Sequence, residues 1–297
     1  MKQKVCLTIA GLDPSGGAGI IADIKTFSAF GCFAAAAIAS ITFQNTQGVF
    51  GAVHQTAETV RKQILPILDD YEIAALKTGM LPTREIIEEV ARIVAENKLE
   101  NFVVDPVVRS TSGFDLIDDV ALKSLIEKLF PLSILVTPNI PEAERIAGMK
   151  IESAADIEKS ARKIQNLGAK NVLIKGGHLP ILDFGLRILD LEYQSANAEL
   201  NRSERFGKDQ KIKTKDRKAI DFMFMGDEEI TYSADFIETT ATHGTGCTFA
   251  AAITAGLANG KTLREAVETA KRFVTEAIRT APNLGKGHSP INHPVNN

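Results

Sequence analysis

The chain has 297 residues, of which 44% are hydrophobic and 24% charged, a composition typical of a globular protein. Its formal net charge of −3 gives no electrostatic reason to expect a nucleic acid or an anionic membrane as partner. The three cysteines are odd in number and form no CxxC pair, which disfavours a disulfide framework and favours a reducing compartment. We therefore expect a cytoplasmic protein that has no membrane-spanning segment.

Short apolar strands alternate with amphipathic helices along most of the chain. The first third predicts strands over 5–10, 34–42, 49–53 and 73–77, and helices over 19–30, 57–70 and 83–97. The middle third predicts strands over 102–104, 134–136 and 172–174, and helices over 118–128, 141–147 and 153–167. The last third predicts a hairpin with strands over 220–225 and 229–233, then helices over 246–259 and 262–280.

This alternation predicts an α/β fold: a three-layer αβα sandwich with a mainly parallel central sheet and helices on both faces. We expect a single domain spanning 1–297. The polar stretch 181–218 interrupts the pattern, and its interspersed acidic and basic residues favour a solvated insertion over a basic binding patch. In such sheets ligands bind beyond the carboxyl ends of the strands, so the residues that follow each strand are the informative ones.

The stretch 242–248 (Thr-His-Gly-Thr-Gly-Cys-Thr) runs directly into an alanine-rich segment that is predicted to be helical. Its two glycines allow a tight turn, which would point several backbone N–H groups and the positive end of a helix dipole at one spot. Such a spot binds anions, most often phosphate. Cys247 lies inside the turn, where the same field would stabilise its thiolate. The stretch therefore predicts the chemical centre of a small-molecule kinase.

A second glycine-rich turn, 11–19, follows the first predicted strand. Gly17-x-Gly19-x-x-Ala22 formally matches a dinucleotide-binding fingerprint, but no Asp or Glu occurs over 33–53 to bind a ribose, which disfavours an NAD-dependent oxidoreductase. A P-loop also fails, because Gly17 occupies the position that requires lysine. We favour a loop whose backbone closes over a small substrate or its phosphate, with a plain strand–helix turn as the alternative.

Polar residues follow several other predicted strands. Gln44 presents a donor and an acceptor side by side, which suits a heteroaromatic ring nitrogen and its amino group. The polar stretch 109–113 has the composition of a loop over phosphates. Each of these features also occurs in ordinary loops.

Four further strand-end residues suit a metal nucleotide. Asp105 is a candidate ligand for Mg²⁺ or for its waters. Asn139 and Glu142 offer an amide oxygen and a carboxylate, and Lys175 offers a cation that could reach a triphosphate. Helix caps and surface ion pairs look the same one at a time, but all four lie at the carboxyl ends of strands.

The motifs occur in an order that resembles the hydroxymethylpyrimidine/phosphomethylpyrimidine kinases of thiamin biosynthesis, within the ribokinase-like superfamily. The resemblance covers nearly the whole chain except 181–218. It is carried by Gly11–Ile20, Gln44-Asn45-Thr46, Asp105-Pro106-Val107, Thr137-Pro138-Asn139 with Glu142, Lys175–His178 and Thr242–Thr248.

The resemblance implies a function: ATP-dependent phosphorylation of 4-amino-5-hydroxymethyl-2-methylpyrimidine and then of its monophosphate, with Mg²⁺. It implies a pyrimidine pocket formed by Gln44, Gly11, Asp23, Met80 and Val107. It implies that Mg·ATP is bound by Asp105, Asn139, Glu142, Lys175 and Thr242, with Asp105 and Glu142 at the metal directly or through water. It implies an anion hole at Thr242, Gly244 and Gly246, with Thr245 among the catalytic residues and Cys247 as the catalytic base. It also implies a homodimer.

A thiol of ordinary pKa, about 8.5, is mostly protonated at neutral pH, so Cys247 would need activation by the helix end. We hypothesise that Cys247 matters when the acceptor is an alcohol, which must lose a proton. It should matter much less when the acceptor is a phosphate, which is already anionic.

The nearest alternative is a pyridoxine or pyridoxal kinase of the same superfamily. An alternative of another class is a non-catalytic ligand-binding or regulatory protein on this fold, against which intact Asp105 and Lys175 argue. The sequence departs from the family in the insertion 181–218 and in Phe43, which stands beside Gln44 where a smaller residue is common. Phe43 is therefore expected to narrow the pocket.

Overall fold

The computed structural model describes residues 2–108, 116–177 and 217–293. Within this part of the chain, nine strands form one sheet in the order β3-β2-β1-β4-β5-β6-β7-β8-β9. The strands are β1 (Val5–Leu12), β2 (Phe33–Asn45), β3 (Gly48–His54), β4 (Ile73–Thr78), β5 (Phe102–Val104), β6 (Leu135–Val136), β7 (Asn171–Lys175), β8 (Lys218–Met225) and β9 (Glu228–Asp235). The six strands from β2 to β7 in this order are parallel, and β3, β8 and β9 join antiparallel at the two edges.

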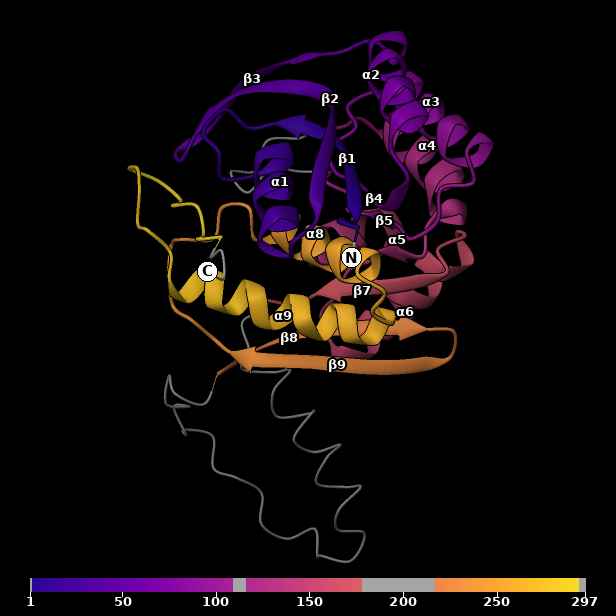
Figure 1. Cartoon of the computed structure of the whole chain (residues 1–297). Helices are drawn as coiled ribbons and strands as arrows, with labels where there is room; N and C mark the ends of the chain where they lie inside the picture. Colours follow the sequence, from indigo (N-terminus) through magenta and orange to yellow (C-terminus); the bar gives the residue numbers. More distant parts are fainter. Residues whose placement is uncertain (1, 109–115, 178–216, 294–297) are drawn as a thin grey trace, which may run out of the picture.

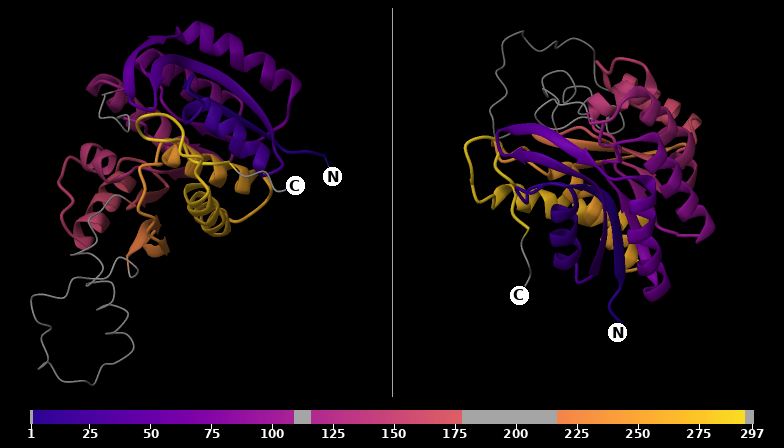
Figure 2. Two further views of the ribbon diagram at one scale, coloured as in Figure 1. Left: turned by 90° about the vertical axis from the view of Figure 1, so that its left-hand side faces the viewer. Right: turned by 90° about the horizontal axis from the view of Figure 1, so that it is seen from above.

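Helices cover both faces of this sheet (Figures 1 and 2). One layer contains α2 (Ala57–Asp70), α3 (Arg84–Glu96), α4 (Asp119–Leu129), α5 (Ile140–Ala147) and α6 (Ala154–Asn166), with the short 3₁₀ helix η1 (Phe130–Leu132) after α4. The other contains α1 (Gly19–Ala29), α8 (Thr245–Ala258) and α9 (Leu263–Arg279). The described residues thus form the three-layer αβα sandwich that the sequence predicts, and the mainly parallel sheet is confirmed.

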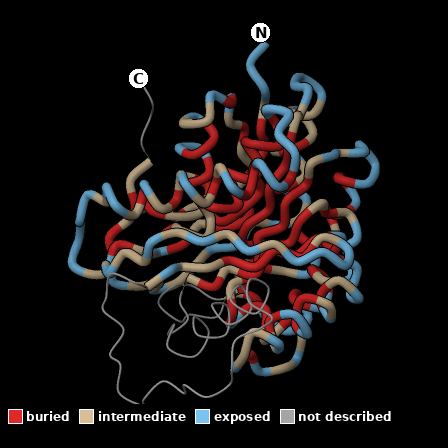
Figure 3. Tube along the Cα trace, turned by 90° about the horizontal axis from the view of Figure 1, so that it is seen from below, coloured by how far each residue is buried: buried red, intermediate tan, exposed pale blue. Residues whose placement is uncertain are grey.

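The central strands are buried on both sides, as the red interior of Figure 3 shows. Successive residues of β1 point to opposite faces: Leu7 and Ile9 pack with α2 and α3, whereas Cys6 packs with α1 and α8. This two-sided burial explains why the strands read as continuous apolar runs in the sequence. A charged residue within such a strand is therefore unusual. Lys77 in β4 is one, and its side chain is fully buried.

The predicted boundaries agree with the structure to within a few residues, with one consequential exception. The strand expected over 34–42 continues to Asn45 and turns back at once into β3, so Gln44 lies within a strand and not in a loop after it. The hairpin predicted around Gly226-Asp227 is confirmed as β8–β9. Most of the expected insertion 181–218, and the expected phosphate loop 109–113, lie outside the described residues. Lys218, the last residue of that expected insertion, belongs instead to β8.

The connections reverse direction on either side of β1, with β2 on one side and β4 on the other. A crevice outside the carboxyl ends of the strands is expected at such a switch point. In the described part of the chain, no helix combines the length and the hydrophobicity that crossing a membrane requires.

Candidate active site

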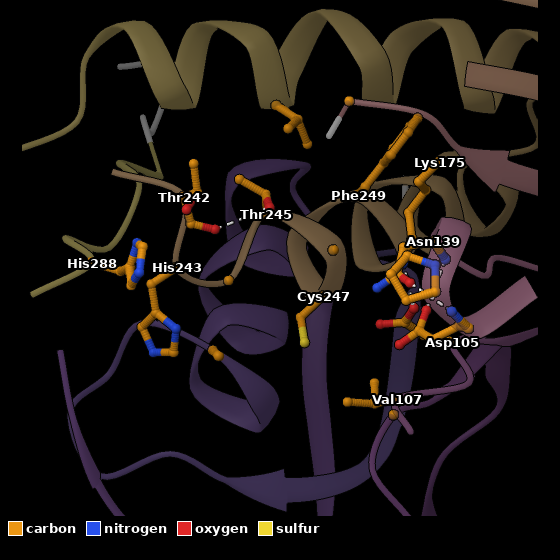
Figure 4. A pocket seen from close by; sticks show the side chains of 18 of the residues that line it. Asp105, Val107, Asn139, Lys175, Thr242, His243, Thr245, Cys247, Phe249 and His288 are labelled. Carbon is orange, nitrogen blue, oxygen red and sulfur yellow. Dashed lines mark hydrogen bonds and ion pairs between the residues drawn. The ribbon is translucent and has the colours of Figure 1, made fainter. Parts of the chain in front are cut away.

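A cavity of about 1330 Å³ lies at this switch point. Every predicted site residue except Asp23 lines it, although the residues come from segments that are far apart in the chain. Figure 4 shows the part of the cavity between Thr242 and Asp105, with the Cys247 sulfur between them. The structure thus brings these residues together around one cavity.

The anion turn, defined here as residues 242–247, leads into α8 with a backbone that only glycine fits. Gly244 has φ 84°, and a Cβ atom there would lie 1.8 Å from the carbonyl oxygen of Gly17. The first helical hydrogen bond runs from the Thr248 amide to Gly244 O at 2.9 Å. The amides of Gly246 and Cys247 precede it and are the donors that a helix N-terminus offers to an anion.

Asp13 and His243 fasten the anion turn to the first glycine-rich turn, and the sequence did not predict this contact. His243 Nε2 lies 2.8 Å from Asp13 Oδ2, and the same carboxylate accepts hydrogen bonds from the amides of Gly17 and Ala18. Burial opposes ionisation of Asp13, but hydrogen bonds from His243 and Ser15 hold its pKa well below the usual range. An ionised Asp13 thus holds the two turns together.

Asp105 and Lys175 form the opposite end of the cavity. The Lys175 Nζ atom lies 2.8 Å from Asp105 Oδ1, which also accepts a hydrogen bond from the Thr137 hydroxyl. Burial of Asp105 opposes its charge, but Lys175 and the buried Lys77 lower its pKa. The carboxylate expected at a metal and the cation expected at a triphosphate are therefore paired with each other in this structure.

Asn139 and Glu142 begin α5 with a capping box. Asn139 Oδ1 accepts from the Glu142 amide at 2.9 Å, and Glu142 Oε2 accepts from the Asn139 amide at 2.8 Å. Glu142 is buried, and this burial raises its pKa to about 7. The Val108 amide also donates a hydrogen bond to this carboxylate, which partly offsets the effect of burial.

The environment of Cys247 corrects the expected activation of its thiol. Burial raises the pKa of Cys247 to about 11, although the nearby Lys77 charge and the Gly19 amide favour the thiolate. Removal from water thus outweighs these two favourable effects, and the resting thiol is protonated at neutral pH. The sequence showed the turn but not that the cysteine would be half-buried in the wall of a cavity.

Asp23 is the one predicted site residue that does not line the cavity. Its side chain is fully buried in the protein interior. Both of its carboxylate oxygens lie 2.9 Å from Lys77 Nζ, and one accepts a hydrogen bond from the Thr8 hydroxyl. The predicted pyrimidine contact of Asp23 is therefore not seen. A lysine within the apolar strand 73–77 was the available signal, because a buried charge requires a buried partner.

The remaining predicted acceptor residues also line the cavity. Gln44, Met80, Val107 and Gly11 are all exposed to the cavity, and a Cβ atom at Gly11 would lie 3.1 Å from the sulfur of Met80. The Phe43 expectation is wrong: its side chain is 51% exposed on the outer surface and does not line the cavity. Strand alternation explains this, since neighbouring residues of β2 point to opposite sides.

The cavity also contains a buried ion pair that the sequence analysis missed. Lys271 Nζ lies 2.6 Å from Asp221 Oδ2, and Asp221 Oδ1 accepts from the Gly176 amide at 3.0 Å. This pair fixes the chain directly after Lys175 against β8 and α9. No sequence spacing indicates it, because Asp221 and Lys271 lie in segments that only the tertiary fold brings together.

A divalent metal fits the donor set at Asp105 and Glu142 in one specific way. Within the described ranges, no group of three or more His, Cys, Asp and Glu side chains could hold an ion by itself. Mg²⁺ commonly takes one or two carboxylates and completes its octahedron with water and phosphate oxygens. Two buried carboxylates beside an anion-binding turn suit a metal that arrives with a nucleotide.

Comparison with known proteins agrees with this geometry. Residues 13–292 match the model of the phosphomethylpyrimidine kinase family. The hydroxymethylpyrimidine/phosphomethylpyrimidine kinase of Bacillus subtilis is 40% identical over 287 residues, which cover 97% of this chain and 93% of that protein.

Two solved structures are similar over nearly the whole chain. The ADP complex of Bacillus subtilis pyridoxal kinase has a TM-score of 0.81 at 33% identity, covering 99% of this chain and 98% of its own. The phosphomethylpyrimidine kinase of Clostridium difficile has a TM-score of 0.72 at 36% identity, covering 93% and 100% respectively. At 33% and 36% identity, both structures share more with this chain than the fold alone.

Proposed function

The chain belongs to the phosphomethylpyrimidine kinase family, and from this premise we propose that it phosphorylates 4-amino-5-hydroxymethyl-2-methylpyrimidine and then the resulting monophosphate. ATP is the phosphoryl donor in this proposal. One observation carries it: a single cavity is lined by a ring-reading amide at Gln44, an anion-binding turn at 242–247 and the Asp105–Lys175 pair.

On the phosphate side, the protein contributes position and charge. Phosphoryl transfer needs stabilisation of the charge that spreads over the transferred group, and the amides of Gly246 and Cys247 supply fixed donors for it. Lys175 neutralises the triphosphate once it exchanges its partner, Asp105, for phosphate oxygens. Asn139 and Thr242 extend the same polar wall on either side of the transfer point.

Asp105 and Glu142 are the residues that would hold Mg²⁺. When bound, the ion supplies neutralisation of the nucleotide phosphate charge. If Asp105 held a divalent cation in place of the Lys175 ammonium, Lys175 would be free to face phosphate. This is a property of the chain's own residues: one carboxylate and one ammonium are stored as a pair until ligands arrive.

On the acceptor side, Gln44 reads the ring, and Gly11, Met80 and Val107 form the apolar wall against which the ring packs. Cys247 lies between the two sides. Its protonated thiol must first lose its proton to solvent, and the resulting thiolate can then accept the proton of the acceptor alcohol. The monophosphate acceptor needs no such transfer, so we assign the Cys247 thiol a role chiefly in the first phosphorylation.

A product assay tests the proposal. The protein is incubated with Mg·ATP and, separately, hydroxymethylpyrimidine, its monophosphate and pyridoxal, and the products are identified by mass. Successive mono- and diphosphate formation from the pyrimidine is expected. Turnover of pyridoxal alone would replace the proposed acceptor, and no ATP turnover with any of the three would favour a binding protein.

A second candidate function is pyridoxal phosphorylation. It is favoured by the TM-score of 0.81 with a pyridoxal kinase, compared with 0.72 for the phosphomethylpyrimidine kinase structure. Sequence identity favours the pyrimidine kinase: it is 40% to the Bacillus subtilis pyrimidine kinase and 33% to the pyridoxal kinase structure. We rank the pyrimidine first because the family model matches residues 13–292.

We also propose a homodimer that forms through the outer face of the β2–β3 hairpin. Phe43 and Val53 are 51% and 52% exposed there, on neighbouring strands at the edge of the sheet. Exposed aromatic and branched side chains on an edge hairpin are typical of a surface that another chain covers. The cytoplasmic location expected from the sequence stays a prediction.

A further inference from the structure

The chain segment 284–291, which we call the C-terminal strap, crosses from the tip of the β2–β3 hairpin to the anion turn. Its first contact is Thr46, at the hairpin tip. Thr46 O accepts from the His288 amide at 2.7 Å, and Thr46 Oγ1 accepts from the amides of Lys286 and Gly287, both at 3.2 Å. Three consecutive strap amides are thus held by one threonine.

The other end of the strap holds the anion turn. The His243 amide donates to Ser289 O at 3.2 Å, and the Ile291 amide donates to His243 O at 3.4 Å, so Pro290 and His243 pair as a parallel bridge. His288 Nδ1 lies 3.3 Å from Thr240 O, just before the turn. Backbone contacts on both sides of Pro290 therefore tie the strap to the same histidine that bonds Asp13.

The glycines of the strap permit this close approach. A Cβ atom on Gly287 would lie 2.1 Å from Thr46 O, and one on Gly285 would lie 2.3 Å from Thr46 Oγ1. Gly285 also has φ 80°, which side-chain-bearing residues rarely adopt. The Leu284 amide donates to Ser289 Oγ at 2.9 Å and closes the strap into a compact loop. The two glycines thus let the backbone of the strap lie in direct contact with Thr46, where a side chain at either position would not fit.

The strap connects two parts of the cavity that the sheet does not connect. Thr46 is two residues from Gln44, and its hairpin is the outermost part of the sheet beyond β1. The anion turn lies at the start of α8. We propose that Thr46, Gly285 and Gly287 are positioning residues that set the distance between the acceptor-reading hairpin and the phosphate-binding turn. This inference rests on the proposed function of Gln44 as the acceptor contact.

The first test is a pair of substitutions at Thr46. Thr46→Val removes the hydroxyl that accepts two amides, and we expect the acceptor KM to rise about fivefold while the KM for ATP stays unchanged. Thr46→Ser keeps the hydroxyl and should restore the wild-type acceptor KM. Thr231→Val on the exposed side of β9 is the matched control, and its acceptor KM should stay at the wild-type value.

The second test separates positioning from direct contact, because Thr46 itself lines the cavity whereas Gly287 does not. Gly287→Ala forces the strap away from Thr46 O, and we expect an acceptor KM raised about tenfold with faster amide hydrogen exchange over residues 43–54. An unchanged acceptor KM in both Gly287→Ala and Thr46→Val, with Gln44→Ala raising it, would overturn the inference.

The same experiment distinguishes failure of the strap from failure of the proposed function. If Gln44→Ala leaves the acceptor KM unchanged, the acceptor assignment of that side chain is wrong. Hydrogen exchange over 43–54 then decides the strap by itself: faster exchange in Gly287→Ala supports a clamp on the hairpin, and wild-type exchange overturns it.

Discussion

The two sides of the cavity are built by different means. The anion turn is determined by the backbone: Gly244 adopts a left-handed φ, lies against Gly17 O, and is followed by a fourteen-residue helix that is buried in the core. The proposed acceptor side takes Gln44 from a hairpin at the edge of the sheet, where Phe43 and Val53 remain half exposed. Its other residues, Gly11, Met80 and Val107, come from the central strands β1, β4 and β5 or directly follow them. The phosphate side is fixed by its own turn and by the buried helix that follows it. The hairpin of the proposed acceptor side is held by the C-terminal strap, which comes from another part of the chain.

This difference separates the chemistry from the choice of substrate. A turn that only glycine can form tolerates no variation without loss of the donor geometry that phosphoryl transfer requires. An edge hairpin can exchange a side chain, or move slightly, without disturbing the core. Strong structural similarity to both a pyridoxal kinase and a phosphomethylpyrimidine kinase is what such a division of labour would produce.

The largest effect is expected from Gly244→Ala, which attacks the rigid side. The new methyl group would overlap Gly17 O, so the turn must shift and its amides lose their aim; we expect kcat to fall about a thousandfold for every acceptor. Steady-state kinetics with both pyrimidine acceptors measures this. The alanine also tests whether the two glycine-rich turns must touch.

Gly260→Ala is the matched control at the other end of α8. It has φ 80°, like Gly244, but no heavy atom lies within 4 Å of the added Cβ. It therefore brings the same backbone strain, about 1 kcal/mol of stability, without the clash. Equal kinetic loss in both variants would mean that strain, not turn geometry, explains the effect.

The next effect is expected from Cys247→Ala, which tests the boundary between the two sides. We expect kcat to fall about a hundredfold with the alcohol acceptor and to stay within about threefold with the monophosphate. Because burial raises the thiol pKa to about 11, the thiolate fraction grows as the pH rises toward that value. The wild-type alcohol rate should therefore increase with pH above neutrality, and the increase should vanish in the variant.

Cys32→Ala controls for loss of a buried thiol, since Cys32 lies in the core away from the cavity. It should leave the pH profile of both steps unchanged. Equal losses with alcohol and monophosphate in Cys247→Ala would contradict the assigned role and would leave the cysteine as part of the anion turn only.

Much of this division could be predicted from the sequence, because the rigid side is encoded locally. Gly244 and Gly246 followed at once by an alanine-rich run specify a turn and a helix start without any tertiary information. Asp105, Asn139 and Lys175 could likewise be placed beside one cavity, because strand ends in a parallel sheet share one edge. Short-range chemistry plus the sheet rule was enough to bring the phosphate side together.

The parts that the sequence could not supply depend on burial and on contacts between distant segments. Asp23 was assigned to the pocket, but a fully buried Lys77 takes both of its oxygens. The Cys247 thiol was expected to be activated, but desolvation outweighs the Lys77 charge and the Gly19 amide that favour the thiolate. The Asp13–His243 contact joins residues that are 230 positions apart, and no local pattern reports such a separation.

A smaller effect is expected from Glu142→Gln, which changes a charge on the phosphate side and keeps its shape. Gln at this position can still accept the Asn139 amide, so the α5 capping box and the fold should persist. We expect the Mg²⁺ concentration for half-maximal rate to rise about tenfold. Titration of activity with Mg²⁺ measures this, and Glu265→Gln in the exposed capping box of α9 is the control.

The pH dependence gives a second readout for Glu142. Burial raises its pKa from 4.5 to about 7, so its charged form increases as pH rises through about 7. The wild-type Mg²⁺ requirement should fall over that interval and should be flat in Glu142→Gln. The folded protein also holds this proton more tightly than the unfolded chain, so this group's contribution to stability is lost as pH rises from about 4.5 to about 7. A wild-type Mg²⁺ requirement that is flat across neutrality would remove Glu142 from the metal site.

The smallest effect on catalysis is expected from Val53→Lys, which alters only the outer face of the acceptor hairpin. A lysine at this half-exposed edge position should weaken the proposed dimer at least about tenfold, because a second copy would have to bury its charge. The kcat of the dissociated protein should stay within about twofold, since the strap holds the hairpin from its own chain. Sedimentation velocity across a concentration series measures the first change and steady-state kinetics the second.

Val120→Lys, on α4 at 58% exposure, is the matched control and should leave both the dimer and kcat unchanged. A monomeric wild-type protein would contradict the dimer, whereas a large loss of kcat on dissociation would show that the partner, and not the strap, keeps the acceptor side in place.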